Sequence, residues 1–255
     1  MSDTHQPILI IGSFVSPYVR KVLACLELKG LAYTVDPITP FYGNDEFSRL
    51  SPLRRIPVLV QGDLALSDSS VICAWLDEAY PDRPALLPEG SPAERARARW
   101  LEEFADSRMG DVFIWDLFFQ KRVHPLVWGE PGDAARIEAA INENIPAILD
   151  YLEGEVPQDG FLFGAQMGLA DVALATFFPN ASYAGCQVDA ARWPRTAGFV
   201  ARCLAQPAFT KPMSYEAAQL RSSQAERRDA LLAVGAPLSE VTYGLPEPRK
   251  GVMVL

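Results

Sequence analysis

The chain has 255 residues and carries 23 Lys and Arg against 32 Asp and Glu, a net charge of −9 with both histidines neutral. Phosphate neutralisation requires a basic face, which an acidic chain does not supply, so we expect no nucleic-acid partner. With 49% hydrophobic and 22% charged residues, the composition is that of a globular protein, and the length favours two domains.

The N-terminal residues and the lengths of the apolar runs bear on cellular location, and the cysteines bear on metal binding. Residues 1–7 lack the basic start and apolar run of a secretory signal, and no apolar run approaches the roughly 20 residues that span a bilayer. We therefore expect a cytoplasmic protein with no membrane partner. The four cysteines are widely spaced and only two histidines are present, so no metal site is expected.

The first predicted elements form a β-α-β unit. Ile8–Ile11 is a continuous apolar run, which is typical of a strand covered on both faces. Ser16-Pro17 predicts the start of a helix, with serine as N-cap, and Gly30 predicts its end. The segment 31–35 then predicts a second strand, and the crossover between the two strands should be right-handed.

An irregular polar stretch is expected over 39–50, before two further strands. The segment 55–60 predicts the third strand, and Pro57 should lie at its beginning because proline cannot donate a ladder hydrogen bond. A short turn then leads to a fourth strand over 64–66.

The second half of the chain is predicted to be helical. The proline-rich stretch 82–91 favours a linker. Ser91 and Glu94 form a capping-box pattern at the start of a long helix with an aromatic-rich second half. The further helices are expected over 133–152, with a kink at Pro146, and near 169–178, 194–204, 215–220 and 221–234.

Two predicted helix starts carry polar groups that suit anion binding. Ser16 precedes the first helix, and Asp68-Ser69 opens the helix that follows the fourth strand. The N-terminus of a helix has free N–H groups and a partial positive charge, so a thiolate or a carboxylate can bind there. Both patterns also fit ordinary helix caps with no ligand.

Taken together, these motifs resemble the glutathione transferase family. The order of elements, the Ile56-Pro57-Val58 corner and the acidic-Ser pair Asp68-Ser69 match its glutathione-binding half, and residues 164–171 resemble its helical folding signature. Gly168 departs from that signature, in which serine or threonine is usual. The resemblance covers about residues 7–220 and implies an α/β plus all-α fold, with an N-terminal thioredoxin-like domain followed by a C-terminal helical bundle domain.

The resemblance also implies roles for residues that would bind glutathione. Ser16 matches the catalytic serine of the serine-type classes, which stabilises the glutathione thiolate. Ile56, before an expected cis Pro57, matches the residue whose backbone pairs with the cysteinyl unit. Asp68 and Ser69 match the Glu-Ser pair that holds the γ-glutamyl end.

The other implied contacts concern the glycyl end and the electrophile. Arg55, or Arg54 in its place, is expected to meet the glycine carboxylate. Phe14, Met109 and Phe113 are expected at the electrophile site, although Phe113 fits a purely structural core position equally well.

The implied activity is that of a glutathione transferase. Glutathione would be the co-substrate for conjugation to a small hydrophobic electrophile in detoxification, and glutathione-dependent peroxide reduction is a related activity. A homodimer is expected. The alternative is a non-catalytic binding or regulatory protein of the same fold. Retention of Ser16 and the other motifs favours the enzyme.

The expected domain ranges are 7–81, a linker over 82–91, and 92–220, followed by a C-terminal extension over 221–255. This extension favours a special partner, and with it the alternative of a binding or regulatory protein. We expect Tyr243–Leu255 to pack in an extended form over the body of the protein, near the electrophile pocket or a partner subunit. The alternative for this segment is a frayed terminus.

Overall fold

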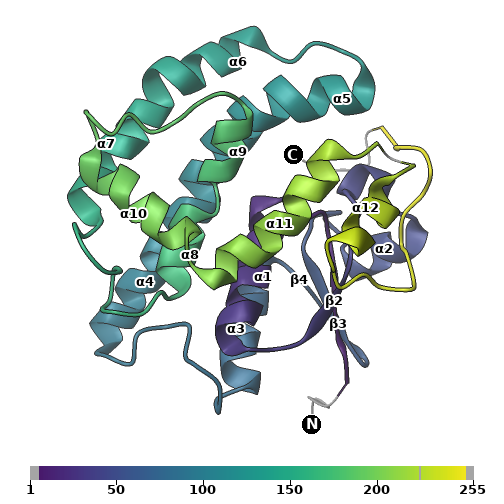
Figure 1. Cartoon of the computed structure of the whole chain (residues 1–255), viewed down its shortest axis with the longest axis horizontal. Coiled ribbons are helices and arrows are strands. Elements are labelled where there is room, and N and C mark those ends of the chain that lie inside the picture. Colours follow the sequence, from purple (N-terminus) through teal and green to yellow (C-terminus); the bar gives the residue numbers. More distant parts are fainter. Residues whose placement is uncertain (1–5, 224, 251–255) are drawn as a thin grey trace. The chain divides into compact units, whose positions relative to one another are not determined.

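The computed structural model describes residues 6–223 and 225–250. Contacts divide the chain into two compact units, of which the first combines the residues up to Leu86 with those from Pro207 onward and the second is Leu87–Gln206 (Figure 1). Residues 207–220 were expected in the helical domain. They group with the first unit because helix α11 (Pro207–Arg221) packs against helix α1 (Pro17–Lys29).

The first unit contains a four-stranded mixed sheet in the order β2-β1-β3-β4. Strand β1 (Ile8–Ile11) pairs in parallel with β2 (Tyr33–Asp36) and antiparallel with β3 (Val58–Gln61), and β3 pairs antiparallel with β4 (Leu64–Ser67). This confirms the thioredoxin-like domain. Strand β3 begins at Val58 and not at residue 55, because the preceding proline has no N–H to donate to the ladder.

Helix α1 begins and ends as predicted. The Ser16 side chain caps its N-terminus, and Gly30 closes its C-terminus in the left-handed conformation at φ 63°. The C-terminal cap needs this conformation, which glycine adopts without steric cost. Helix α3 (Ser69–Ala79) likewise begins at the predicted cap, Asp68.

Helix α2 (Asp45–Leu50) was not predicted, since residues 39–50 were expected to be irregular. Asn44 caps it by accepting from Phe47 N at 2.9 Å, and the short helix η1 (Pro40–Tyr42) precedes it. A helix of six residues spans less than two turns, so it shows no hydrophobic period in the sequence.

The core of the first unit lies on both faces of the sheet. Ile11 and Val58 are paired neighbours and pack with Phe47 of α2 in one buried cluster. Because side chains alternate along a strand, the buried pair Ile10 and Leu59 points to the opposite face.

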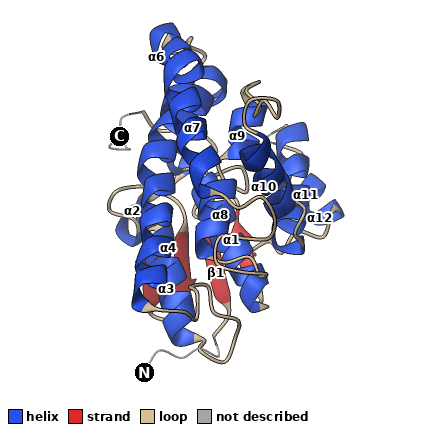
Figure 2. Cartoon of the chain, turned by 90° about the vertical axis from the view of Figure 1, so that its left-hand side faces the viewer, coloured by secondary structure: helices blue, strands red, loops and turns tan. Residues whose placement is uncertain are grey.

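The second unit is helical, and all four strands of the described residues belong to the first unit (Figure 2). This confirms the helical second domain. Within residues 6–223 and 225–250, no helix is long and apolar enough to cross a membrane. The elements of this unit are α4 (Pro92–Phe104), η2 (Ala105–Val123), α5 (His124–Trp128), α6 (Ala134–Ala139), η3 (Ala140–Asn144), α7 (Ile145–Glu155), α8 (Leu169–Ala175), α9 (Phe178–Tyr183) and α10 (Pro194–Leu204).

Two sequence signals of the second unit appear in the structure. Ser91 and Glu94 form the predicted capping box at the start of α4. Asp171 accepts from Leu162 N at 2.8 Å and from Gly168 N at 2.9 Å, so it makes the half of a capping box that reaches back to the N-cap, while Gly168 has no side chain to make the other half. Burial raises the pKa of Asp171 to about 6, against the opposite effect of these N–H donors.

The C-terminal extension contains helix α12 (Arg227–Ala233), followed by an extended segment. Val35 N donates to Pro237 O at 2.7 Å, and Ser239 N donates to Val35 O at 2.9 Å, so the extension pairs with the free edge of β2 (Figure 1). Tyr243, Leu245 and Arg249 also form backbone hydrogen bonds with residues 41–44, so residues 243–250 dock on the first unit, as predicted. Their predicted position near an electrophile pocket or a partner subunit stays a prediction, and residues 251–255 lie outside the described residues.

Candidate functional site

Three candidate segments lie at the same end of the sheet, where β1 and β4 end and β3 begins. Ile11, Val58 and Ser67 form a row of paired residues across β1, β3 and β4. Ser16 follows this row through the β1–α1 loop, Ile56-Pro57 immediately precedes it, and Asp68 immediately follows it. The sheet therefore brings together the predicted thiolate, cysteinyl and γ-glutamyl contacts.

Ser16 is partly buried at the start of the 13-residue helix α1. It has an extended backbone, with φ −71° and ψ 128°, and its Oγ accepts from Val19 N at 3.4 Å. Because the oxygen is the acceptor in this bond, the hydroxyl hydrogen can still donate to an anion. The helix N-terminus favours negative charge at the same place.

The Ile56–Pro57 peptide bond is cis, as predicted. Ile56 lies against the β1–α1 loop at Gly12, where an added Cβ would stand 3.1 Å from Ile56 Cβ and 2.5 Å from Val19 Cγ2. The φ of Gly12 is 152°, so both the space and the backbone conformation require glycine here. Ile56 precedes the paired part of β3, whose first residue is Val58.

Asp68 holds the start of α3 in a strained conformation. Its φ is 112°, which is rare for a residue with a side chain. The carboxylate accepts from Ser70 N at 2.9 Å and Val71 N at 3.1 Å, while its own N–H donates to Pro57 O at 3.5 Å. Strain of this kind is maintained by the surroundings and gathers at functional sites.

Ser69 is buried beside Lys21 of α1. Lys21 Nζ lies 3.4 Å from Ser69 Oγ and 3.0 Å from Ser70 Oγ, and the lysine is fully buried. An ammonium group only donates, so both hydroxyl oxygens act as acceptors, and the Ser69 hydroxyl can still donate its hydrogen to a ligand anion. The sequence patterns did not identify Lys21.

The two arginines before the cis bond differ in their surroundings. Arg54 is buried, at φ 51°, and its guanidinium donates to the carbonyl oxygens of Pro40 and Gly43, each at 2.8 Å. Arg55 is exposed, and its backbone N–H and C=O both form hydrogen bonds with the Ser51 hydroxyl. Arg54 is therefore occupied within the fold, and Arg55 is the arginine accessible to a ligand.

The residues expected at the electrophile site are all buried. Phe14 is 1% exposed and packs edge to face on Tyr215, with ring centroids 5.4 Å apart, so in this structure it is a core residue of the first unit. Met109 and Phe113 belong to helix η2 of the second unit, where Phe113 packs on Phe178. The structure gives these three residues structural contacts, and their role toward an electrophile stays a prediction.

Helix α11 supports the loop that carries Ser16. Gln219 Oε1 accepts from Phe14 N at 3.2 Å, and Gln219 Nε2 donates to Ser13 Oγ at 2.9 Å. Arg20 and Glu216, both fully buried, form an ion pair through two hydrogen bonds of 2.9 and 2.6 Å. These contacts were missed from the sequence, because the partners lie about 200 residues apart and neither forms a motif.

This arrangement provides donors for an acidic peptide-like ligand with a thiol. The hydroxyl of Ser16 suits the thiolate, the buried Ser69 suits a carboxylate, and the exposed Arg55 suits a second carboxylate. A hydrogen bond to the charged form of a group favours that form and lowers the pKa of a thiol.

Comparisons with known proteins agree with this arrangement. The model of the glutathione S-transferase N-terminal domain matches residues 10–84, and that of the C-terminal domain matches residues 134–202. Glutathione S-transferase 3 of Zea mays is 31% identical over 214 residues, which cover 82% of this chain and 94% of the relative. A glutathione S-transferase of Hyoscyamus muticus is 28% identical over 212 residues, covering 80% and 97%.

A solved structure extends the match to the fold. The crystal structure of a glutathione S-transferase from Rhodospirillum rubrum superposes with a TM-score of 0.75 at 26% identity, covering 88% of this chain and 99% of that chain. The two matched domain models and this superposition span both units of the chain.

Proposed function

Because the chain belongs to the glutathione S-transferase family, whose co-substrate is glutathione, we propose that it conjugates the glutathione thiolate to a small hydrophobic electrophile. The observation that carries the proposal is the position of Ser16. Its hydroxyl stands at the start of α1, which follows the same end of the sheet as the cis Ile56–Pro57 corner and the Asp68-Ser69 helix start.

The chemical task of Ser16 is to favour the thiolate. A free thiol has a pKa near 8.5, so only about a few per cent is ionised at neutral pH, and the thiolate is the nucleophile. Each unit by which the thiol pKa falls corresponds to about 1.4 kcal/mol. The Ser16 hydroxyl donates to the sulfur, and the sulfur then attacks the electrophilic carbon and displaces its leaving group.

The remaining residues hold the rest of glutathione. The backbone of Ile56 pairs with the cysteinyl unit, Asp68 and Ser69 receive the γ-glutamyl end, and Arg55 meets the glycine carboxylate. Met109 and Phe113 are candidates for the electrophile side. The proposal includes a cytoplasmic homodimer, which sedimentation tests as a species of twice the 28.0 kDa chain mass.

Replacing Ser16 tests the proposal. Ser16→Ala should raise the pKa of the bound thiol by about one to two units, since a hydrogen bond to a charged group contributes about 1.5–3 kcal/mol. The thiolate absorbance is titrated against pH in both proteins, and kcat/KM is measured for a panel of electrophiles. Ser16→Thr, which keeps a hydroxyl, is the control.

The outcomes separate the proposed activity from its alternatives. An unchanged titration and undiminished conjugation in Ser16→Ala would remove Ser16 from the mechanism. Binding of glutathione by the natural protein with an unshifted thiol pKa would instead favour a non-catalytic binding protein. Turnover of hydroperoxides alone in the same panel would favour peroxide reduction.

A further inference from the structure

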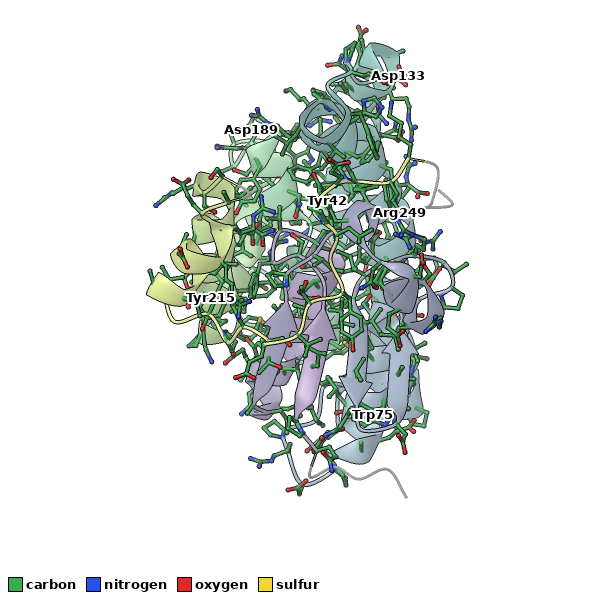
Figure 3. All side chains as sticks on the ribbon, turned by 90° about the vertical axis from the view of Figure 1, so that its right-hand side faces the viewer. Tyr42, Trp75, Asp133, Asp189, Tyr215 and Arg249 are labelled. Carbon is green, nitrogen blue, oxygen red and sulfur yellow. The ribbon has the colours of Figure 1, made fainter. Side chains whose placement is uncertain are left out.

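The C-terminal strap, defined here as residues 242–249, lies beside the segment 41–45 that leads into α2. Asn44 N donates to Tyr243 O at 2.8 Å, Leu245 N donates to Tyr42 O at 2.6 Å, and the backbones of Gly43 and Gly244 form an antiparallel bridge. Figure 3 shows Tyr42 and Arg249 at this contact. The strap therefore pairs with the segment much as one strand pairs with another.

A buried carboxylate anchors one end of the strap. Asp36, at the end of β2, accepts from Thr242 Oγ1 at 2.9 Å and from Tyr243 N at 2.7 Å. The Tyr243 side chain also packs against the buried cluster around Phe47. An extended segment of a chain terminus stays in place when it has both polar partners and apolar contacts.

The other end of the strap closes on the start of α2. Arg249 N donates to Phe41 O at 2.8 Å, and its guanidinium pairs with Asp45 at 2.7 Å. Burial, and to a lesser degree the charge of Arg249, lower the pKa of Arg54.

Arg54 holds the same segment from within. Its guanidinium binds the carbonyl oxygens of Pro40 and Gly43, so residues 40–45 lie between this side chain and the strap. Arg54 is followed directly by Arg55 and the cis Ile56–Pro57 bond. If residues 40–45 moved, the buried Arg54 side chain that binds them would move as well, and this would shift the neighbouring Arg55.

We propose that the strap is a positioning element for the glycyl end of glutathione. It keeps residues 41–45 and Arg54 in one conformation, so that Arg55 faces the glycine carboxylate before the ligand arrives. Ordering a residue on binding costs conformational entropy, and a site that is ordered in advance avoids this cost. This inference rests on the proposed function, which places glutathione along Ser16, Ile56 and Asp68.

The test compares two truncated chains and two ligands. Truncation after Ser239 removes the strap but keeps the pairing of Pro237 and Ser239 with β2, whereas truncation after Lys250 removes only residues outside the described range. Calorimetry measures the Kd of glutathione and of γ-glutamylcysteine, which lacks the glycyl unit. We expect truncation after Ser239 to weaken glutathione binding about tenfold, equivalent to about 1.4 kcal/mol, and to change γ-glutamylcysteine binding less than twofold.

A point variant isolates one backbone contact of the strap. Leu245→Pro removes the N–H that donates to Tyr42 O, while Leu245→Ala shortens the side chain and keeps that N–H. Hydrogen exchange at Asn44 N, which donates to the strap, should accelerate in Leu245→Pro and not in Leu245→Ala. Exchange in β3 should stay slow in both, which shows that the sheet is intact.

Three results would overturn the positioning role. One is equal weakening of both ligands by truncation after Ser239, because a general loss of structure would act on both. Another is unchanged glutathione affinity although Asn44 exchange has accelerated. If the full chain binds neither ligand, the proposed function itself fails and the inference fails with it, whereas the first two results leave the proposed function intact.

Discussion

Helices α1 and α3 both begin at the candidate site, but their N-cap residues, Ser16 and Asp68, are held by different means. Ser16 of α1 has an ordinary extended backbone and a single long cap bond of 3.4 Å, and its loop is fixed by α11. Asp68 of α3 has a strained backbone at φ 112° and two cap bonds of 2.9 and 3.1 Å to its own helix.

The difference shows that one site can combine remote and local support. The loop before α1 depends on residues about 200 positions away in the chain, so changes in α11 should reach Ser16 without touching it. The start of α3 is capped by the carboxylate of Asp68 next to it, although Lys21 of α1 also bonds Ser69, so changes at Asp68 itself should disturb it most. The following predictions test this contrast, from the largest expected effect to the smallest.

Glu216→Ala should have the largest effect on the loop before α1. It leaves the fully buried Arg20 without its bidentate partner, and removal of one member of a buried pair costs about 3–5 kcal/mol in the free energy of unfolding. Denaturant unfolding measures the loss. The double variant Arg20→Met with Glu216→Leu, which removes both charges, should recover part of the stability. A loss below about 1 kcal/mol would contradict remote support through this pair.

Asp68→Ala should act on ligand binding at α3. Loss of a charge-assisted contact to the γ-glutamyl end should weaken the binding of glutathione by about 1–3 kcal/mol, measured by calorimetry. Glu78→Ala, an exposed position near the other end of α3, is the matched control and should leave the Kd unchanged. Equal affinities of Asp68→Ala and the natural protein would remove Asp68 from the site.

Gln219→Met should show whether the hydrogen bonds from α11 to the loop before Ser16 affect the bound thiol as well as the stability of the fold. The variant keeps the side-chain length but leaves the buried Phe14 N–H without its acceptor, at a cost of about 1–3 kcal/mol in stability. Because the loop before Ser16 loosens, the pKa of the bound thiol should rise, by less than in Ser16→Ala. A thiol titration identical to that of the natural protein would show that α11 stabilises the fold without positioning Ser16.

Asp68→Gly should have the smallest effect, and it concerns stability alone. Glycine adopts φ 112° without the strain of a side chain, and glycine in place of an aspartate cap costs only about a few tenths of a kcal/mol. The free energy of unfolding should therefore stay within about 0.5 kcal/mol of the natural protein, while Asp68→Ala loses about 1 kcal/mol. Equal losses in the two variants would show that the strained conformation has no energetic role.

Much of the fold was predictable because it follows from local signals. Ser16-Pro17 and Gly30 mark the two ends of α1, and Ser91 with Glu94 marks the start of α4. These signals act over three or four residues, so the sequence contains all that is needed to interpret them.

The missed features depend on distant partners or on very short elements. Gln219 and Glu216 stabilise the loop before Ser16, but nothing near them in the sequence indicates their partners. Helix α2 is too short for a periodic pattern. The ring contact of Phe14 with Tyr215 was not predicted either, and the role of Phe14 toward an electrophile stays a prediction.

The pairing of the C-terminal extension with β2 also bears on the association of one copy of the protein with another. β2 is an outer strand of its sheet, and the free N–H and C=O groups of an outer strand attract strands of other molecules. Here the N–H and C=O of Val35 are already bonded to Pro237 and Ser239 of the same chain. At Val35, another molecule must displace this segment before it can add to that edge, so we expect the extension to hinder edge-to-edge association there.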